Sequence, residues 1–323
     1  MSISEFKNQM NRWGQEKVPF LFMVDFEMEN PIIIRLSDID QTKILFDING
    51  FKNGNDSLES PESISIEKLP ISFTNYKKKF DSVFHHLEYG DSFLTNLTVN
   101  TEIRIDHSLR DIFKFSKAKY KVLYENQFLV FSPETFVKIQ NGKIFSFPMK
   151  GTIDASIPDA EQKILTNQKE LSEHVTIVDL IRNDLSLVAT NVDVTRFRYV
   201  EEIRTHSKSL LQVSSEISGD LSQDYKAHLG DALVTLLPAG SISGAPKQKT
   251  IEIIKEAEGA KRGFYTGVFG YFDGESLDSG VMIRYIEQVH GKYFYRSGGG
   301  ITTQSDAMAE YQEVLDKIYV PVD

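Results

Sequence analysis

The sequence predicts an α+β fold in one large domain, with strands and helices mixed irregularly along the chain. Short apolar runs typical of strands occur in the N-terminal third and again between residues 120 and 150. Helical patterns are interspersed without the regular strand–helix alternation of a doubly wound sheet. No linker-like stretch divides the 323 residues, so we expect a single domain over residues 1–323.

The N-terminal third predicts two strands, a loop and a helix. Residues 20–24 and 31–34 are continuous apolar runs and predict strands. The polar stretch 53–65, which contains glycine and proline, predicts a surface loop. Residues 73–89 carry an amphipathic pattern, so we expect a helix that ends at Gly90.

The rest of the chain contains hairpin-like strands and helices in no regular order. Asn141-Gly142 is a strong two-residue hairpin signal between two of the strands. Pro246 and Gly259 mark the two ends of a helix. Strands are predicted at 120–124, 128–132, 136–140, 143–148, 263–274 and 279–289, and helices at 159–181, 247–258 and 306–319.

Composition excludes several classes of function. The net charge is −10, which disfavours nucleic acid and anionic membrane surfaces as bulk partners. The chain has no cysteine, which excludes disulfides, zinc–thiolate sites, iron–sulfur clusters and thiol nucleophiles. No apolar run reaches membrane-spanning length, and the N-terminus lacks the pattern of a secretory signal. We therefore expect a cytoplasmic protein.

Two pairs of glutamates have a spacing that suits a metal site. Glu170 and Glu173 are three residues apart, as are Glu310 and Glu313, so each pair shares one face of a predicted helix. Two such faces that meet would offer the carboxylate oxygens that Mg²⁺ prefers. On spacing alone, solvent-exposed helix surface is the commoner explanation of such pairs.

Two glycine-containing segments and one lysine also suggest chemistry. Residues 240–247 place small side chains at a helix start, where backbone N–H groups and the helix dipole favour an anion. The run 298–300 permits a close backbone approach, although a tight turn explains it equally well. Lys150 lies at the end of a strand-like run, where burial would make it a nucleophile, but a surface lysine is the commoner case.

Taken together and in order, six segments resemble the chorismate-utilising enzymes. This family includes component I of anthranilate synthase and of aminodeoxychorismate synthase, together with isochorismate and salicylate synthases. The resemblance implies two facing antiparallel sheets with helices packed outside, a family core over 73–320, and a shortened N-terminal portion over 1–72. The segments are 132–136, 148–152, 169–185, 238–247, 262–267, and 298–301 with 309–313.

The resemblance implies a magnesium site and a cradle for chorismate. Glu173 and Glu313 would bind Mg²⁺ directly, and Glu170 and Glu310 would act through water. The metal would hold the ring carboxylate, and Tyr265 with Arg284 would bind the enolpyruvyl carboxylate, the rest of the cradle being backbone and a lysine. The implied substrate-binding residues are Ser241, Ser243, Gly244, Tyr265, Arg284, Gly298, Gly299, Gly300 and Lys317.

Lys150 selects a member of the family. The segment Pro148-Met149-Lys150-Gly151-Thr152 is similar to that of the aminodeoxychorismate synthases, whereas anthranilate synthases usually carry a small residue in place of the lysine. This similarity implies that Lys150 adds to chorismate as a covalent nucleophile. Glu134 would act as the general acid. The ammonia would come from a separate glutaminase subunit, because a chain without cysteine cannot house a cysteine glutaminase.

Two positions depart from the family pattern. Isochorismate and salicylate synthases carry a water-activating lysine where we align Leu94, which argues against water addition. The family also tends to have a histidine where we align Leu211, since His206 is too far upstream to match. The alternatives are an anthranilate synthase component I, an isochorismate or salicylate synthase, and a non-catalytic scaffold.

Overall fold

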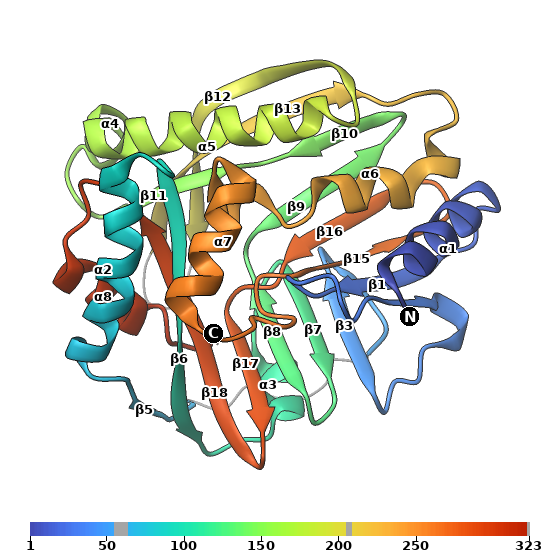
Figure 1. The fold of residues 1–323 in the computed structure, drawn as a ribbon. Helices are drawn as coiled ribbons and strands as arrows, with labels where there is room; N and C mark the ends of the chain where they lie inside the picture. Colours follow the sequence, from blue (N-terminus) through green and yellow to red (C-terminus); the bar gives the residue numbers. More distant parts are fainter. Residues whose placement is uncertain (55–63, 205–208, 322–323) are drawn as a thin grey trace.

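A computed structural model describes residues 1–54, 64–204 and 209–321, so most of the predicted loop 53–65 and His206 lie outside the described part. Two antiparallel sheets, each of nine strands in the described residues, lie against each other, and helices cover their outer faces (Figure 1). This confirms the predicted α+β class with two antiparallel sheets.

The first sheet gathers strands from both ends of the chain. Its β12 (Thr190–Arg204) pairs with β13 alone, off the main path. Along that path the order is β11 (Met149–Asp154), β13 (Ser209–Asp220), β10 (Lys143–Ser146), β9 (Thr135–Gln140), β16 (Leu277–Val281), β15 (Val268–Phe272), β1 (Phe20–Val24) and β2 (Ile32–Arg35).

The second sheet is built in the same way. Its β5 (Ile66–Leu69) pairs with β6. The order is β14 (Gly244–Ala245), β6 (Leu94–Ile105), β18 (Lys292–Ile301), β17 (Tyr285–Val289), β8 (Phe128–Ser132), β7 (Tyr120–Tyr124), β3 (Ile44–Ile48) and β4 (Phe51–Lys52).

Each outer face has its own helices (Figure 1). On the first sheet, α1 (Ile3–Gln15) packs with α6 (Leu229–Leu236), and α4 (Ala160–Thr166) and α5 (Gln168–Ser186) lie on β11 and β13. On the second sheet, α2 (Phe73–Tyr89), α7 (Lys247–Glu258) and α8 (Ala307–Asp316) cover β6 and β18, and α3 (Leu109–Phe115) packs on β7 and β8. Single 3₁₀ turns span Leu36–Asp38, Tyr225–His228 and Gly240–Ile242. Within the described residues, no helix is both long and apolar enough to cross a membrane.

Strand β1 shows how one apolar run serves two cores. Its five residues are all buried. Phe20, Phe22 and Val24 pack under the helices, whereas Leu21 and Met23 pack in the layer between the two sheets. This follows from the alternation of side chains along a strand, and it explains why the run contains no polar residue.

The chain crosses between the sheets several times, and two of these crossings lie side by side. It passes from β8 to β9 at Pro133 and Glu134, and from β16 to β17 at residues 282–284. The Phe131 N–H donates to the Arg284 carbonyl and the Val281 N–H donates to the Glu134 carbonyl, each at 3.1 Å. The two crossings are therefore held together by their own backbones.

Three predicted elements are corrected by the structure. The strand 279–289 is two strands in different sheets, and Arg284 between them takes a positive φ of 53°. The helix 159–181 breaks at Asn167, whose side chain caps the next helix by accepting the Glu170 N–H. The strand 263–274 begins only at Val268, because residues 263–266 form a turn.

Two helix predictions are confirmed together with their stop signals. The helix predicted at 73–89 spans Phe73–Tyr89, and Gly90 ends it with a φ of 90°. The helix predicted at 247–258 spans Lys247–Glu258, and Gly259 ends it with a φ of 65°. In both cases glycine adopts the left-handed conformation that ends a helix without strain.

Replacing Phe269 with alanine should destabilise the protein by about 3–5 kcal/mol, because the ring is fully buried between the two sheets and leaves a cavity there. Urea unfolding followed by circular dichroism measures this change. The matched control is Phe93→Ala, since that ring is 70% exposed. Equal midpoints for the two variants would contradict the inter-sheet core described above.

Candidate active site

A cavity of about 240 Å³ lies where the two sheets meet α5 and α8, and a wider cleft of about 1160 Å³ adjoins it. Lys150 and Gln212 of the first sheet line both spaces. Twelve of the predicted site residues line the cavity: Glu134, Lys150, Glu173, Ser241, Ser243, Tyr265, Arg284, Gly298, Gly299, Gly300, Glu313 and Lys317.

Three predicted site residues are not in the cavity lining. Glu170 lines the adjoining cleft. Glu310 is 7% exposed and accepts a hydrogen bond from the Ser305 hydroxyl at 2.7 Å. Gly244 packs against β6, where a Cβ would lie 1.8 Å from the Leu94 carbonyl oxygen. This position requires glycine for close strand packing, whatever its role toward a substrate.

Helices α5 and α8 bring the four glutamates to one side of the cavity. Glu173 on α5 is paired with the Lys150 Nζ at 2.6 Å. Glu313 on α8 is paired with the Lys317 Nζ, also at 2.6 Å. Strand β18 passes close to α8 at Gly299, where a Cβ would lie 3.2 Å from Glu310 Oε2. A side chain at that position would therefore press on the carboxylates.

The donor chemistry of these glutamates fits a hard divalent cation. Their carboxylate oxygens are the ligands that Mg²⁺ prefers, and Glu170 Oε2 is buried without a hydrogen-bond partner. Among the described residues, no three acidic or histidine side chains are drawn together in a geometry that would hold a metal. The Lys150 and Lys317 ammonium groups neutralise Glu173 and Glu313 here, so cation binding requires these side chains to rearrange.

Lys150 lies among carboxylates. Burial by itself lowers the pKa of this lysine, but Glu173, Glu170 and Glu313 raise it more, and the net pKa lies above the ordinary value of 10.5. Its side chain is partly exposed toward the cavity. The residue is thus an ammonium group, held on Glu173 at the edge of the space that a substrate would occupy.

Glu134, at the first crossing, lines the same cavity as Lys150. Burial raises the pKa of its carboxyl, although the Ser241 hydroxyl that donates to Oε1 and the nearby Arg284 and Lys317 act in the opposite direction. A carboxyl with a raised pKa holds its proton to higher pH, which is the property that a general acid needs.

Cationic and phenolic groups cover the remaining polar wall. Arg284 Nε donates to the Tyr319 hydroxyl at 3.4 Å, and its guanidinium lies 5.4 Å from the centre of that ring. Lys317 Nζ donates to the Gly298 carbonyl at 2.8 Å. Burial raises the pKa of Tyr265 to about 12, so its phenol is a neutral hydrogen-bond donor. This wall suits a small anion.

The structure adds cavity residues that the sequence pattern did not identify. Gln212 lines the cavity, whereas Leu211, which we aligned with the family histidine, lines a separate outer groove. Successive residues of a strand point to opposite faces, so the side chain to consider on β13 is Gln212. Asn96 lines the cavity from β6, and so does Leu94, which we aligned with the water-activating lysine of the family; the two are on the same face of the strand. The alternation of β13 was the signal that could have found Gln212.

A model of the chorismate binding enzymes matches residues 25–323. The chain belongs to this family.

The relatives include both uncharacterised and named proteins. An uncharacterized PabA-like protein of Pasteurella multocida is 51% identical over the full length of both chains. Aminodeoxychorismate synthase component 1 of Salmonella typhimurium is 31% identical over 75% of this chain, which spans 56% of that protein. Anthranilate synthase component 1 of Arthrobacter globiformis is 37% identical over 59% of this chain and 36% of its own.

A solved structure supports the fold of this chorismate-binding enzyme. The menaquinone-specific isochorismate synthase MenF of Escherichia coli superposes with a TM-score of 0.74, over 98% of this chain and 81% of its own. The sequence identity is 14%, so the likeness concerns the fold alone.

The raised pKa of Glu134 predicts a pH-dependent effect of Glu134→Gln on stability. The wild-type carboxyl contributes most below its ordinary pKa of 4.5, and this contribution is lost as the pH rises through the raised folded value. A glutamine loses nothing, so the melting temperature of the variant should rise relative to wild type as the pH increases from about 4.5 to 8.

Thermal unfolding over that pH range measures the difference, with Glu252→Gln on the exposed face of α7 as the control. The same pH trend in both variants would show that burial of Glu134 has no influence on its ionisation.

Proposed function

We propose that this protein is a component I of aminodeoxychorismate synthase, which aminates chorismate at C4 to give 4-amino-4-deoxychorismate. The single observation that carries the proposal is the position of Lys150 in the cavity wall, 2.6 Å from Glu173. Membership of the chorismate binding family supports chorismate as the substrate, and a lysine in the cavity wall supports a reaction through a covalent adduct.

The first step forms a bond between the Lys150 amine and C2 of the ring. The two conjugated double bonds of the ring each shift by one bond, the C4–O bond breaks, and the hydroxyl leaves as water with a proton from Glu134. Only a neutral amine is nucleophilic, so the Lys150–Glu173 ion pair must open before the attack. The raised pKa of Glu134 supports its role as the acid.

The second step reverses the first with a different nucleophile. Ammonia forms a bond to C4, both double bonds return, and the C2–N bond breaks. Lys150 leaves the ring, and the proton that its amine regains balances the proton that the added ammonia loses. The sum is chorismate plus ammonia giving aminodeoxychorismate plus water. Two allylic displacements replace one difficult substitution.

Substrate recognition follows from the charges that line the cavity. Arg284 and the Tyr265 phenol bind the enolpyruvyl carboxylate, and Lys317 lies near the ring carboxylate. Backbone and hydroxyl groups of the two glycine-containing segments complete the cradle, at Ser241, Ser243, Gly298, Gly299 and Gly300. A dianion thus finds local donors within an acidic protein.

A Mg²⁺ ion is the cofactor in this proposal. Glu173 and Glu313 would hold it directly, with Glu170 and Glu310 acting through water. It would polarise the ring carboxylate and absorb negative charge that develops in the ring.

The proposal includes a biological setting. The whole of residues 1–323 forms one chorismate-binding catalytic domain, and the enzyme works in the cytoplasm in the synthesis of 4-aminobenzoate and folate. A separate glutaminase subunit delivers the ammonia, because this chain lacks the cysteine that such chemistry requires. Leu94 in the cavity wall is apolar and cannot activate water, which argues against the reaction of an isochorismate synthase.

Purified protein incubated with chorismate, Mg²⁺ and ammonium at mildly alkaline pH should form a product of aminodeoxychorismate mass. Lys150→Ala should lower the rate by at least about 100-fold, because the covalent route is lost. Chromatography with mass detection follows the products. Lys249→Ala, on the exposed face of α7, is the matched lysine control and should be fully active.

Each other outcome has a distinct meaning. Anthranilate, isochorismate or salicylate as the product would replace the proposed reaction with another of the same family. Full activity of Lys150→Ala would remove the covalent step. A wild-type protein that binds no chorismate, with or without a glutaminase, would overturn the enzymatic proposal.

Removal of metal should abolish the reaction. EDTA should stop turnover and added Mg²⁺ should restore it, and Mg²⁺ should raise the melting temperature of the wild type. The double variant Glu173→Gln, Glu313→Gln should lose both effects, whereas Glu161→Gln, exposed on α4, should keep them. Turnover at an unchanged rate in EDTA would contradict the metal site.

A further inference from the structure

We propose that a buried ion pair behind the cavity, Arg262 with Glu258, is the positioning device that fixes the substrate-binding wall. Arg262 is 1% exposed and the Glu258 side chain is 6% exposed, and neither lines the cavity. Since the wall they support is assigned to chorismate, the inference rests on the proposed function.

The pair is held in one geometry by two parallel hydrogen bonds. Arg262 Nε donates to Glu258 Oε2 at 3.0 Å, and an Arg262 terminal nitrogen donates to Glu258 Oε1 at 2.6 Å. The guanidinium lies 4.7 Å from the centre of the Phe26 ring, and the backbone N–H of the same residue donates to Glu27 Oε1 at 2.9 Å. A fully buried charge requires this degree of compensation.

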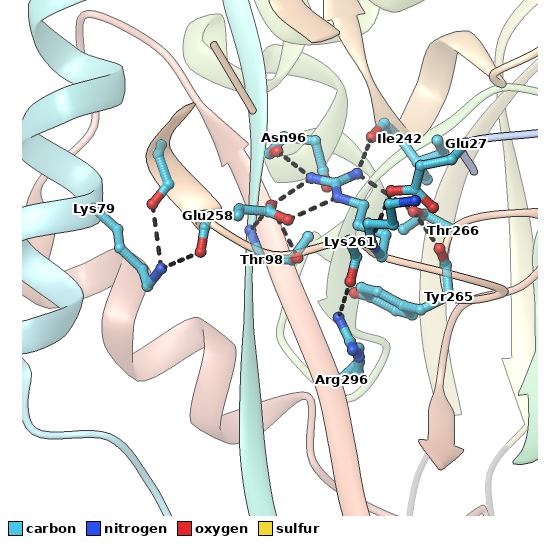
Figure 2. Close-up of polar contacts among 12 residues, drawn as sticks. Glu27, Lys79, Asn96, Thr98, Ile242, Glu258, Lys261, Tyr265, Thr266 and Arg296 are labelled. Carbon is cyan, nitrogen blue, oxygen red and sulfur yellow. Dashed lines mark hydrogen bonds and ion pairs between the residues drawn. The ribbon is translucent and has the colours of Figure 1, made fainter. Parts of the chain in front are cut away.

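The remaining donors of Arg262 reach three separate segments of the cavity wall. They bind the Asn96 carbonyl on β6 at 2.7 Å, the Ile242 carbonyl at 2.9 Å and the Thr266 hydroxyl at 3.4 Å. Figure 2 shows Asn96, Ile242 and Thr266 converging on this point from different elements. All three of these residues line the cavity.

The ion pair also binds backbone groups of β6 beyond the point where its neighbour β14 ends. Strand β14 pairs with β6 only at Leu94 and Thr95, and the Asn96 N–H then donates to the Ser243 carbonyl. Beyond that point, the Thr98 N–H donates to Glu258 Oε1 at 2.9 Å while Arg262 takes the Asn96 carbonyl (Figure 2). The two side chains thus satisfy the backbone groups that a neighbouring strand would otherwise bind.

Strand β6 also pairs with β18, on the side away from β14, and this pairing connects the ion pair to the cavity. Asn96 and Thr98 pair with Gly300 and Gly298 of β18, which line the cavity. A shift of β6 would therefore move the glycine segment as well as the loop around Ile242 and the turn that carries Tyr265. One guanidinium joins all of these segments, which a lysine with a single ammonium group cannot do.

The test is Arg262→Lys, which keeps a positive charge beside Glu258 but loses the paired guanidinium donors. If Arg262 positions the wall, kcat/KM for chorismate should fall about 10- to 100-fold, with a raised KM, in protein that circular dichroism shows to be folded at the assay temperature. The matched control is Arg110→Lys. Arg110 likewise binds a carboxylate, that of Glu125, and a backbone carbonyl, that of Thr42, but away from the cavity.

A purely structural pair predicts a different result, namely a lower melting temperature for Arg262→Lys with kcat and KM unchanged in the folded protein. A kcat/KM within twofold of wild type would overturn the inference. Should Arg262→Lys fail to fold, the charge-neutral double variant Arg262→Gln, Glu258→Gln takes its place, with the same expected loss and the same overturning result.

Calorimetric titration with chorismate separates this inference from the proposed function. Wild-type protein that binds chorismate but makes another product leaves the inference standing, and Arg262→Lys should then bind chorismate at least about 10-fold more weakly. Equal affinities of the variant, the Arg110→Lys control and the wild type would reject the positioning role regardless of the reaction.

Discussion

The cavity depends on the two adjacent crossings between the sheets. Glu134 lies on one crossing and Arg284 on the other. A backbone hydrogen bond of 3.1 Å joins each of these residues to the strand that leads into the other crossing, β16 for Glu134 and β8 for Arg284. The carboxyl and the guanidinium therefore keep a defined relation as long as the sheets stay packed. Loss of the apolar layer between the sheets would disturb both groups at once, although neither belongs to that layer.

The chemistry of the site follows from uneven distribution of charge in an acidic protein. Carboxylates from α5 and α8 pair with Lys150 and Lys317, whereas Arg284, which donates to the Tyr319 hydroxyl, and the Tyr265 phenol line the cavity without a carboxylate partner of their own in the contacts described above. Low dielectric surroundings strengthen each of these interactions relative to water. Burial also keeps the Glu134 carboxyl protonated to higher pH, while nearby carboxylates keep Lys150 charged. The surroundings of the two residues therefore raise the pKa of both, by burial at Glu134 and by neighbouring carboxylates at Lys150.

The buried ion pair adds a second level of organisation. Arg262 and Glu258 do not touch the cavity, yet they join the strand, the loop and the turn that form its wall. A buried pair of this kind contributes little net stability compared with an apolar replacement. Its directional hydrogen bonds give a geometric precision that apolar packing lacks, which is a physical reason for a charged pair at this position.

Local physics in the sequence determined the α+β class and several elements. Helices that end at Gly90 and Gly259, and the strand at 20–24, follow from glycine stop signals and continuous apolar runs. The ordered segments also identified most of the cavity-lining residues by resemblance. What the pattern could not reveal was the division of 279–289 between two sheets, because an apolar run has the same composition on either side of a crossing.

Only the tertiary structure decided which side chains face one another. Gln212 rather than Leu211 faces the cavity because the register of β13 against its neighbours sets the direction of each side chain. The contacts of Arg262 join residues 96, 242 and 266, which are far apart in the chain. Local sequence determines propensity, whereas long-range pairing determines which groups meet, since that depends on the packing of the whole chain.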